Sequence, residues 1–405
     1  MDGFGDILRR HRKTGKLSLR AMADRVAYDF GYLGQIERGD RPVTGAVVAA
    51  YDGALDAGGA LVQAYQQERT GDVDVRRRTV IQAMGALAAA PAVSPLIALE
   101  ALRHGLGAAV DVDHDEWEHI VAGYGLGYYQ QPTDALMDKL GTDLTILQHQ
   151  IAADTGARRP HLLRAAGCLS VIVALGLVAS GQTLMSRRWW LTAQQAADES
   201  GDPDVRVLVR AWDVVNGCYD GRPPAEVVAL SDQVLPLLHG QATSASCGLL
   251  AGRAQALSLA GLHAEAMATV RQLSDLAEQL PGAVVGDVES LWGWPEHRLR
   301  HTESWVYTHA GRLADAEAAQ ERALELYPLS QVRLRAQVQL HQAACLVRGG
   351  HIPDGLRLAA DLLDDLPVEQ QNALLRSVAR QVADVVPTAE RRRPVYGELV
   401  ERVTA

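Results

Sequence analysis

The feature that most constrains the fold is the stretch WVYTHAGRLADAEAAQERALELYP, at residues 305–328. Its apolar first half predicts a helix that ends at Gly311, and a second helix follows and stops at Pro328. The second helix carries the small residues Ala316 and Ala323. Short helices of this kind are held only by packing, so the stretch predicts a helical hairpin stacked on neighbours.

Similar patterns flank this stretch on both sides. They occupy residues 171–203, 205–238, 250–281 and 339–367, with weaker pairs at 114–152 and 370–403. Glycines stand at three of the expected turns: Gly181, Gly261 and Gly350. From about residue 111 to the end, the sequence therefore predicts an all-α solenoid of about six helix pairs with a concave inner face.

These units resemble the tetratricopeptide repeat. In that repeat a glycine makes the tight turn, alanines allow close helix contact, and a proline separates successive units. Tyr307 stands at the aromatic position of the repeat, whereas Gln320 replaces a second usual aromatic. The resemblance implies a tetratricopeptide-like right-handed helical solenoid whose first helices line the concave groove.

One insertion interrupts the regular spacing. The segment PGAVVGDVESLWGWPEHRLR, residues 281–300, adds length between two expected hairpins. Trp292 and Trp294 lie there in a Gly- and Pro-containing context that cannot continue a helix. Long insertions in repeat proteins tend to lie on a binding face, so this segment is a candidate ligand-contacting loop.

The N-terminal residues predict a separate small domain of five short helices. The first is amphipathic and ends near Gly15, and Ser18 is placed to cap the second. Asp29 is placed to cap a third helix, which Gly39 would end. A fourth helix would follow Thr44, and a fifth would cover residues 61–68. Two short helices joined by a tight turn, the second polar on its outer face, indicate a helix-turn-helix.

The stretch LSLRAMADRV…YLGQIERGDRPVT, within residues 4–66, resembles the phage-repressor-like (Cro-type, xenobiotic-response-element) helix-turn-helix family. Its most specific part is IERGDRP. The resemblance implies that Gln35 reads a base and that Arg38 and Arg41 hold phosphates. It also implies a phosphate contact for Ser18, and it makes Glu37 a structural residue paired with an arginine such as Arg20 or Arg25.

The exposed first turn of the expected recognition helix departs from the family pattern, which usually has polar base readers there. Phe30 either touches a thymine methyl or fills the small core, and Tyr32 is placed to bond a phosphate. The candidate DNA-binding residues are Ser18, Arg20, Phe30, Tyr32, Gln35, Arg38 and Arg41.

Three segments are expected along the chain: a DNA-binding domain at 1–70, a linker with an apolar helix at 71–110, and a repeat domain for sensing and dimerisation at 111–405. Within the linker, the arginines and apolar run of residues 76–92 resemble a twin-arginine export signal. The apolar run is shorter than the roughly 20 residues of a membrane span. We therefore expect a packed linker helix and no membrane partner.

The N-terminal residues differ from the rest of the chain in their charge balance. Residues 1–41 hold nine bases against six acids, whereas the whole chain carries a net charge of -10. A basic end on an acidic body indicates that only this end meets a polyanion. The four cysteines are far apart and have no metal-ligand spacing, which favours buried free thiols in a reducing cytoplasm.

The sequence carries little that suggests catalysis. It has no phosphate-binding glycine loop, no HExxH and no G-x-S-x-G motif. We expect no enzymatic activity, no cofactor and no bound metal.

A recognition surface is the more promising candidate. Helical spacing puts Arg298, His301, Trp305 and His309 on one stripe that suits a peptide or small molecule. Ordinary packing is the alternative for this stripe. The candidate ligand-binding residues are Arg210, Asn216, Gln255, Trp292, Trp294, Arg298, His301, Trp305 and His309.

A phage-repressor-like domain joined to tetratricopeptide-like hairpins resembles the peptide-sensing quorum regulators of bacteria. The resemblance implies a cytoplasmic, homodimeric transcription regulator that binds a double-stranded DNA operator. A peptide or small-molecule effector would change the spacing of its two DNA-binding domains. Two alternatives remain open: the repeat domain binds another protein without a small effector, or the protein is a scaffold that has lost sequence readout.

Overall fold

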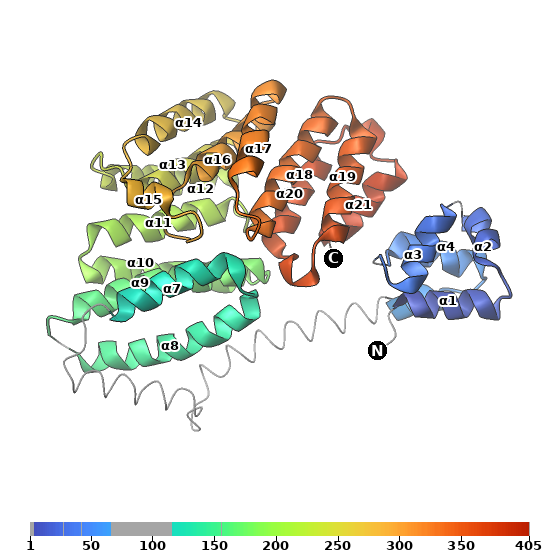
Figure 1. Ribbon diagram of the computed structural model, residues 1–405, viewed down its shortest axis with the longest axis horizontal. Helices are drawn as coiled ribbons and strands as arrows, with labels where there is room; N and C mark the ends of the chain where they lie inside the picture. The colour runs from blue at the N-terminus through green and yellow to red at the C-terminus, as the bar shows by residue number, and fades with distance from the viewer. Residues whose placement is uncertain (1–3, 27, 42, 66–115, 155, 405) are drawn as a thin grey trace.

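The computed structural model describes residues 4–26, 28–41, 43–65, 116–154 and 156–404. Within these ranges every regular element is a helix, so the fold is all-α, as the sequence predicts. Figure 1 shows a small group of helices next to the C-terminal end of a long curved array. We call residues 4–65 the head and the described residues from 116 onward the body.

The head is built from four helices and a further helical stretch at residues 60–65. The four are α1 (Phe4–Thr14), α2 (Leu19–Val26), α3 (Phe30–Arg38) and α4 (Gly45–Ala54). One core holds them together, with Leu8, Met22, Leu33, Ile36 and Tyr51 all fully buried. The fifth expected helix is thus present as far as residue 65, and residues 66–68 lie outside the described part of the chain.

The predicted cap at Asp29 and the predicted helix end at Gly39 are confirmed. The Asp29 carboxylate accepts a hydrogen bond of 2.9 Å from the Tyr32 amide at the start of α3. Gly39 ends that helix at φ +80°, the left-handed conformation that glycine adopts without a Cβ penalty. The Thr44 hydroxyl accepts from the Val47 amide at the start of α4. These caps fix where the chain turns before and after α3.

The body consists of seven helical hairpins, one short extra helix, α15 (Gly282–Gly286), and three short 3-10 helices at Leu235–Leu237, Val368–Gln370 and Thr388–Glu390. The hairpins pair α7 (Glu116–Gln130) with α8 (Thr133–Ala153), α9 (Arg159–Ala179) with α10 (Thr183–Ser200), α11 (Pro203–Gly217) with α12 (Pro224–Val234), α13 (Ser244–Leu259) with α14 (His263–Ala277), α16 (Glu296–His309) with α17 (Leu313–Leu326), α18 (Val332–Arg348) with α19 (Ile352–Asp365), and α20 (Ala373–Asp384) with α21 (Pro394–Thr404). All the hairpin positions expected from the sequence are occupied, and the array is a helical solenoid (Figure 1).

Glycine makes the tight turns that the repeated pattern predicts. Gly181, Gly261, Gly311 and Gly350 have φ values of +76°, +76°, +69° and +91°. A side chain is strained in this region of φ, which explains why glycine recurs between paired helices. The turns therefore fix the hairpin geometry independently of the side chains that fill the core.

The helix α9 is long and apolar enough to cross a membrane by length and composition alone. It lies instead between α8 and α10, and 89% of its most apolar window is buried inside the fold. Residues such as Leu169 and Ile172 are fully buried in the largest core cluster of the body. Its apolar composition is thus that of a core helix.

The insertion before α16 folds back onto the first helix of the body, and we call its residues 287–295 the closing loop. The Leu291 amide donates to the Gly125 carbonyl at 2.9 Å, and the Trp292 indole donates to the Val121 carbonyl at 3.0 Å. Both carbonyls belong to α7, the first helix of the body. A Cβ at Gly125 would lie 2.2 Å from the Trp292 ring nitrogen, so this contact requires glycine. The loop therefore joins the start of the array to its middle.

Candidate DNA-binding surface and body cavity

Helix α3 presents one apolar and one polar face. Leu33 and Ile36 are fully buried, whereas Gln35 and Arg38 are exposed on the opposite side. This division follows the 3.6-residue period, and it leaves the amide and the guanidinium facing solvent. Arg38 is held at its base by the Asp40 carboxylate at 2.8 Å, with 58% of its side chain exposed. The expected recognition helix thus has a free polar face.

Neighbouring residues extend this exposed face. Ser18 is exposed, and its hydroxyl accepts from the Ala21 amide at the start of α2. The Arg20 guanidinium lies 5.6 Å from the centre of the Phe30 ring, which is 48% exposed. Phe30 is therefore not a core residue, and that alternative was wrong. Phe4 occupies the core instead.

Glu37 is structural, but its expected partner was wrong. Arg12, and neither Arg20 nor Arg25, pairs with it, at 2.6 Å between Arg12 Nε and Glu37 Oε1. The Tyr51 hydroxyl also donates to this carboxylate, at 2.9 Å. The hydrogen bond with Glu37 raises the pKa of Arg12, and burial followed by the Glu37 charge raises the pKa of Tyr51. This buried group ties α1, α3 and α4 together.

The remaining two candidates of the head face the body. Arg41 lies 3.6 Å from the Asp361 carboxylate of α19. Tyr32 is partly buried near the C-terminal hairpin, and its pKa is raised by burial and then by the Glu398 charge. The Gly45 amide, at the N-terminus of α4, donates to the Glu401 carboxylate of α21. Of the groups expected to hold phosphate, Arg41 thus pairs with a carboxylate of the body.

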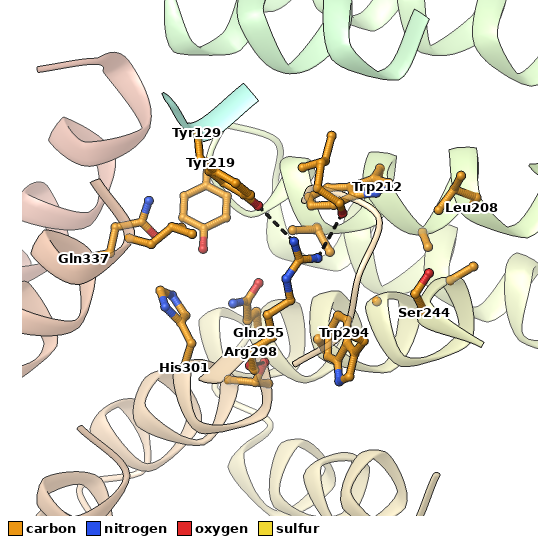
Figure 2. Close-up of a pocket in the computed structure, with 18 of the residues that line it drawn as sticks. Tyr129, Leu208, Trp212, Tyr219, Ser244, Gln255, Trp294, Arg298, His301 and Gln337 are labelled. Atoms are coloured by element: carbon orange, nitrogen blue, oxygen red, sulfur yellow. Dashed lines mark hydrogen bonds between the residues drawn. The ribbon is translucent and has the colours of Figure 1, made fainter. Parts of the chain in front are cut away.

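The body contains a cavity of about 110 Å³ that is lined by residues of several hairpins. Figure 2 shows residues from α7, α11, α13, α16 and α18 converging on it. Its walls are mainly apolar and aromatic, with a few polar side chains among them. The lining includes Tyr129, Leu208, Trp212, Tyr219, Gly248, Gln255, Leu291, Trp294, Arg298, His301, Tyr327 and Gln337.

Arg298 projects from α16 into the middle of this group (Figure 2). Its Nη1 donates to the Leu291 carbonyl at 3.2 Å, and its Nη2 donates to the Ser290 carbonyl at 3.0 Å and to the Tyr129 hydroxyl at 3.2 Å. The guanidinium also lies 5.8 Å from the ring centres of Trp212 and Trp294. The cation is thus held in place by neutral oxygens and aromatic faces.

The other polar groups of the cavity are neutral. Burial lowers the pKa of His301 to about 4, with a smaller contribution from the Arg298 charge. Its Nδ1 lies 3.0 Å from the Tyr327 hydroxyl. Gln255 is only 4% exposed, and its carbonyl oxygen has no hydrogen-bond partner in the described structure. At neutral pH the cavity therefore presents one positive charge and one unpaired acceptor.

Four of the nine candidate ligand residues line this cavity: Gln255, Trp294, Arg298 and His301. Trp305 is fully buried, so it packs in the core and does not extend the stripe. His309 bonds the Trp305 carbonyl, and Trp292 bonds helix α7.

Two further candidates also lie apart from the cavity lining. Arg210 pairs with Asp198, and Asn216 is buried away from the cavity wall. Of the four residues of the predicted stripe on α16, Trp305 and His309 thus take part in ordinary packing and do not line the cavity.

The sequence did not indicate Tyr129, Tyr219, Tyr327 or Gln337 as cavity residues. Each comes from a different hairpin or turn, and no spacing along one helix links them. Aromatic residues at corresponding places of successive hairpins would have been the only available signal. The cavity forms where several hairpins that are distant in the sequence meet, and a projection of one helix does not reveal such a meeting.

Metal and thiol chemistry find little support in the described residues. No group of three His, Cys, Asp or Glu side chains there is placed to hold a metal ion. The four cysteines are free thiols, and three of them are buried. Burial raises the pKa of Cys168, Cys218 and Cys247 to about 12, which keeps these thiols protonated and unreactive at neutral pH.

The family described as "Helix-turn-helix domain" matches residues 4–64 of the chain. Comparison with curated proteins and with solved structures gives no match. The match spans the four head helices and agrees with the exposed face of α3. The chain therefore has an N-terminal helix-turn-helix domain followed by a long helical region, which suggests a DNA-binding regulator. Domains of this class are typically not enzymes.

Proposed function

We propose that the protein is a cytoplasmic transcription regulator that binds duplex DNA through the outer face of α3. The observation that carries this proposal is the exposure of Gln35 and Arg38 on a helix whose other face is fully buried. A glutamine amide can bond an adenine bidentately in the major groove, and an arginine beside it can neutralise a phosphate. Ser18, Arg20 and Phe30 extend the same exposed face.

We further propose that the protein acts as a homodimer. Two helix-turn-helix domains read half-sites about 34 Å apart, one turn of the DNA. The segment between head and body, with its predicted apolar helix at 76–92, and the domain limits at 70 and 110 lie outside the described residues. The proposal therefore depends on the head and body themselves.

The body supplies a means of control, because its acidic end contacts the head. Asp361 pairs with Arg41, and Glu401 accepts from the Gly45 amide. The same cation and the same helix N-terminus cannot serve a phosphate and a carboxylate at once. We infer that this contact opposes DNA binding and that an effector held in the body cavity alters it.

Selection of genomic DNA fragments by the purified protein, followed by footprinting at two salt concentrations, tests the proposed function. A discrete protected operator that persists at the higher salt supports a sequence-reading regulator. Only unspecific binding that falls steeply with salt would instead support a scaffold without readout. A thermal-shift screen with short peptides and metabolites, beside capture of protein partners from lysate, tests whether the body takes a small effector or another protein.

A further inference from the structure

The charge of Arg298 is not balanced by a carboxylate. Among the described residues no acid pairs with its guanidinium, which bonds only the carbonyls of Ser290 and Leu291 and the Tyr129 hydroxyl. Arg222, in the same body, shows the ordinary arrangement: it pairs with the buried Asp213 and Asp220 at 2.7 and 2.9 Å. A partly buried cation without a counter-ion favours binding of an anion.

The geometry of Arg298 leaves room for such an anion. Three of its five N–H donors are engaged, which leaves the Nε–H and one Nη1–H available. The neighbouring histidines carry no charge at neutral pH, because burial lowers the pKa of His297 to about 3 and of His301 to about 4. The cavity therefore offers charge complementarity to one negative group and not to two.

The other lining residues indicate what the uncharged part of the ligand is like. Trp212 and Trp294 flank the guanidinium, and Leu208 and Leu291 add apolar walls. A cavity of about 110 Å³ holds on the order of ten water-sized groups, given roughly 10–15 Å³ for each. A compact molecule of about ten non-hydrogen atoms fits this space.

Gln255 gives a second and independent indication of a ligand. Its side chain is more than nine-tenths buried, lines the cavity and has a carbonyl oxygen without a partner. An unsatisfied buried acceptor is costly unless a donor reaches it. A bound molecule, or water carried with it, would supply that donor.

We propose that the cavity binds a small monocarboxylate with an apolar, preferably aromatic, body. The carboxylate pairs with the free donors of Arg298, and the apolar part lies between Trp212 and Trp294. Tyr129 and the Ser290–Leu291 carbonyls hold the same guanidinium, so binding acts where α7, the closing loop and α16 meet. Its regulatory meaning rests on the proposed function, whereas the binding itself does not.

Matched acid and amide probes test the chemistry directly. Calorimetry on the full chain would compare 3-phenylpropanoate, benzoate and octanoate with the corresponding amides. We expect at least one acid to bind about tenfold or more tightly than its amide, because a charge-assisted bond is lost with the amide. No preference for the acid in any of the three pairs overturns the proposal.

Substitutions at Arg298 test its role. Arg298→Gln is expected to remove the acid preference, lowering the affinity about 10- to 100-fold, and Arg298→Lys to restore part of it. Arg206→Gln on α11 is the control, since Arg206 pairs with Asp198 away from the cavity lining. Unchanged affinity in Arg298→Gln would refute the assignment.

Gly248 allows a test that leaves the native contacts in place. It lines the cavity, and a Cβ there would meet only Ala211 and Trp294, each at 3.8 Å. Gly248→Leu is expected to fill the space and abolish acid binding, whereas Gly248→Ala binds as the wild type does. Retained binding in a folded Gly248→Leu protein would contradict the location.

A final arm separates a free acid from the C-terminus of a peptide. A short acetylated alanine peptide ending in phenylalanine carries the same carboxylate and ring as 3-phenylpropanoate. We expect the free acid to bind more tightly, and tighter binding of the peptide would overturn the small-molecule assignment. Footprinting of the same preparation distinguishes the two proposals: intact operator binding without acid binding defeats only this inference.

Discussion

At the scale of single residues, the head depends on a buried charge pair. Arg12 and Glu37 join α1 to α3, and Tyr51 adds a hydrogen bond from α4. The side chains of Arg12 and Glu37 are only 9% and 3% exposed. Removing one partner of such a pair leaves an unpaired buried charge, which costs far more than removing both.

Arg12→Leu is therefore expected to destabilise the head by about 3–5 kcal/mol. The double variant Arg12→Leu with Glu37→Leu is expected to lose clearly less. All seven tryptophans lie at residue 117 or later, so tryptophan fluorescence reports on the body alone. Hydrogen exchange of the head amides measures the effect, and equal protection in the wild type and Arg12→Leu would show that the pair contributes little.

At the scale of elements, the closing loop is held to α7 through a close approach at Gly125. A Cβ there would clash with the Trp292 ring, which would lose its bond to the Val121 carbonyl. Gly123 lies on the same helix with nothing within 4 Å of its Cβ position. The two glycines thus form a matched pair.

Gly125→Ala is expected to displace the loop and lower body stability by about 1–3 kcal/mol, as overpacking does. Gly123→Ala is expected to be neutral or slightly stabilising, because alanine favours a helix by up to about 1 kcal/mol over glycine. Urea unfolding followed by tryptophan fluorescence measures both. Similar midpoints for the two variants would contradict the role of the loop contact.

The contact between head and body is a second test at this scale. Glu401→Gln and Asp361→Asn remove carboxylates that contact the Gly45 amide and Arg41. Both are expected to raise DNA affinity several-fold at low salt, since the groups released become available to phosphate. Asp365→Asn, an exposed residue of α19, controls for net charge. An equal gain from Asp365→Asn would show that the effect is only long-range.

At the scale of the whole molecule, a group of buried histidines links body stability to pH. Burial lowers the pKa of His297 to about 3, and of His301 and His309 to about 4, against about 6.5 in the unfolded chain. The unfolded chain then binds more protons between pH 6.5 and 4. The contribution of these histidines to the free energy of unfolding is fully present above pH 6.5, and it is lost as the pH drops through this window.

Each histidine contributes a loss of up to about 1.4 kcal/mol per pH unit in that range. The urea midpoint of the body is therefore expected to be lower at pH 5 than at pH 7.5. His297→Phe is expected to reduce this difference, whereas His149→Gln, on the exposed side of α8, is expected to leave it unchanged. A midpoint independent of pH would show that these histidines titrate normally in the folded protein.

The sequence predicts local features of this molecule well and long-range ones poorly. The glycine turns and the cap at Asp29 follow from backbone chemistry within a few residues, and they are found where expected. The partner of Glu37 and the lining of the cavity depend on which distant helices meet. No spacing along one helix could indicate that Tyr129 reaches Arg298.

The most direct measurement of the central claim, that the outer face of α3 reads DNA, is a titration of the selected operator and a scrambled duplex with two variants. Gln35→Ala is expected to narrow the affinity difference between the two duplexes. Arg38→Ala is expected to weaken binding to both and to reduce the salt slope by about one. Unchanged operator affinity and salt slope in both variants would contradict the account.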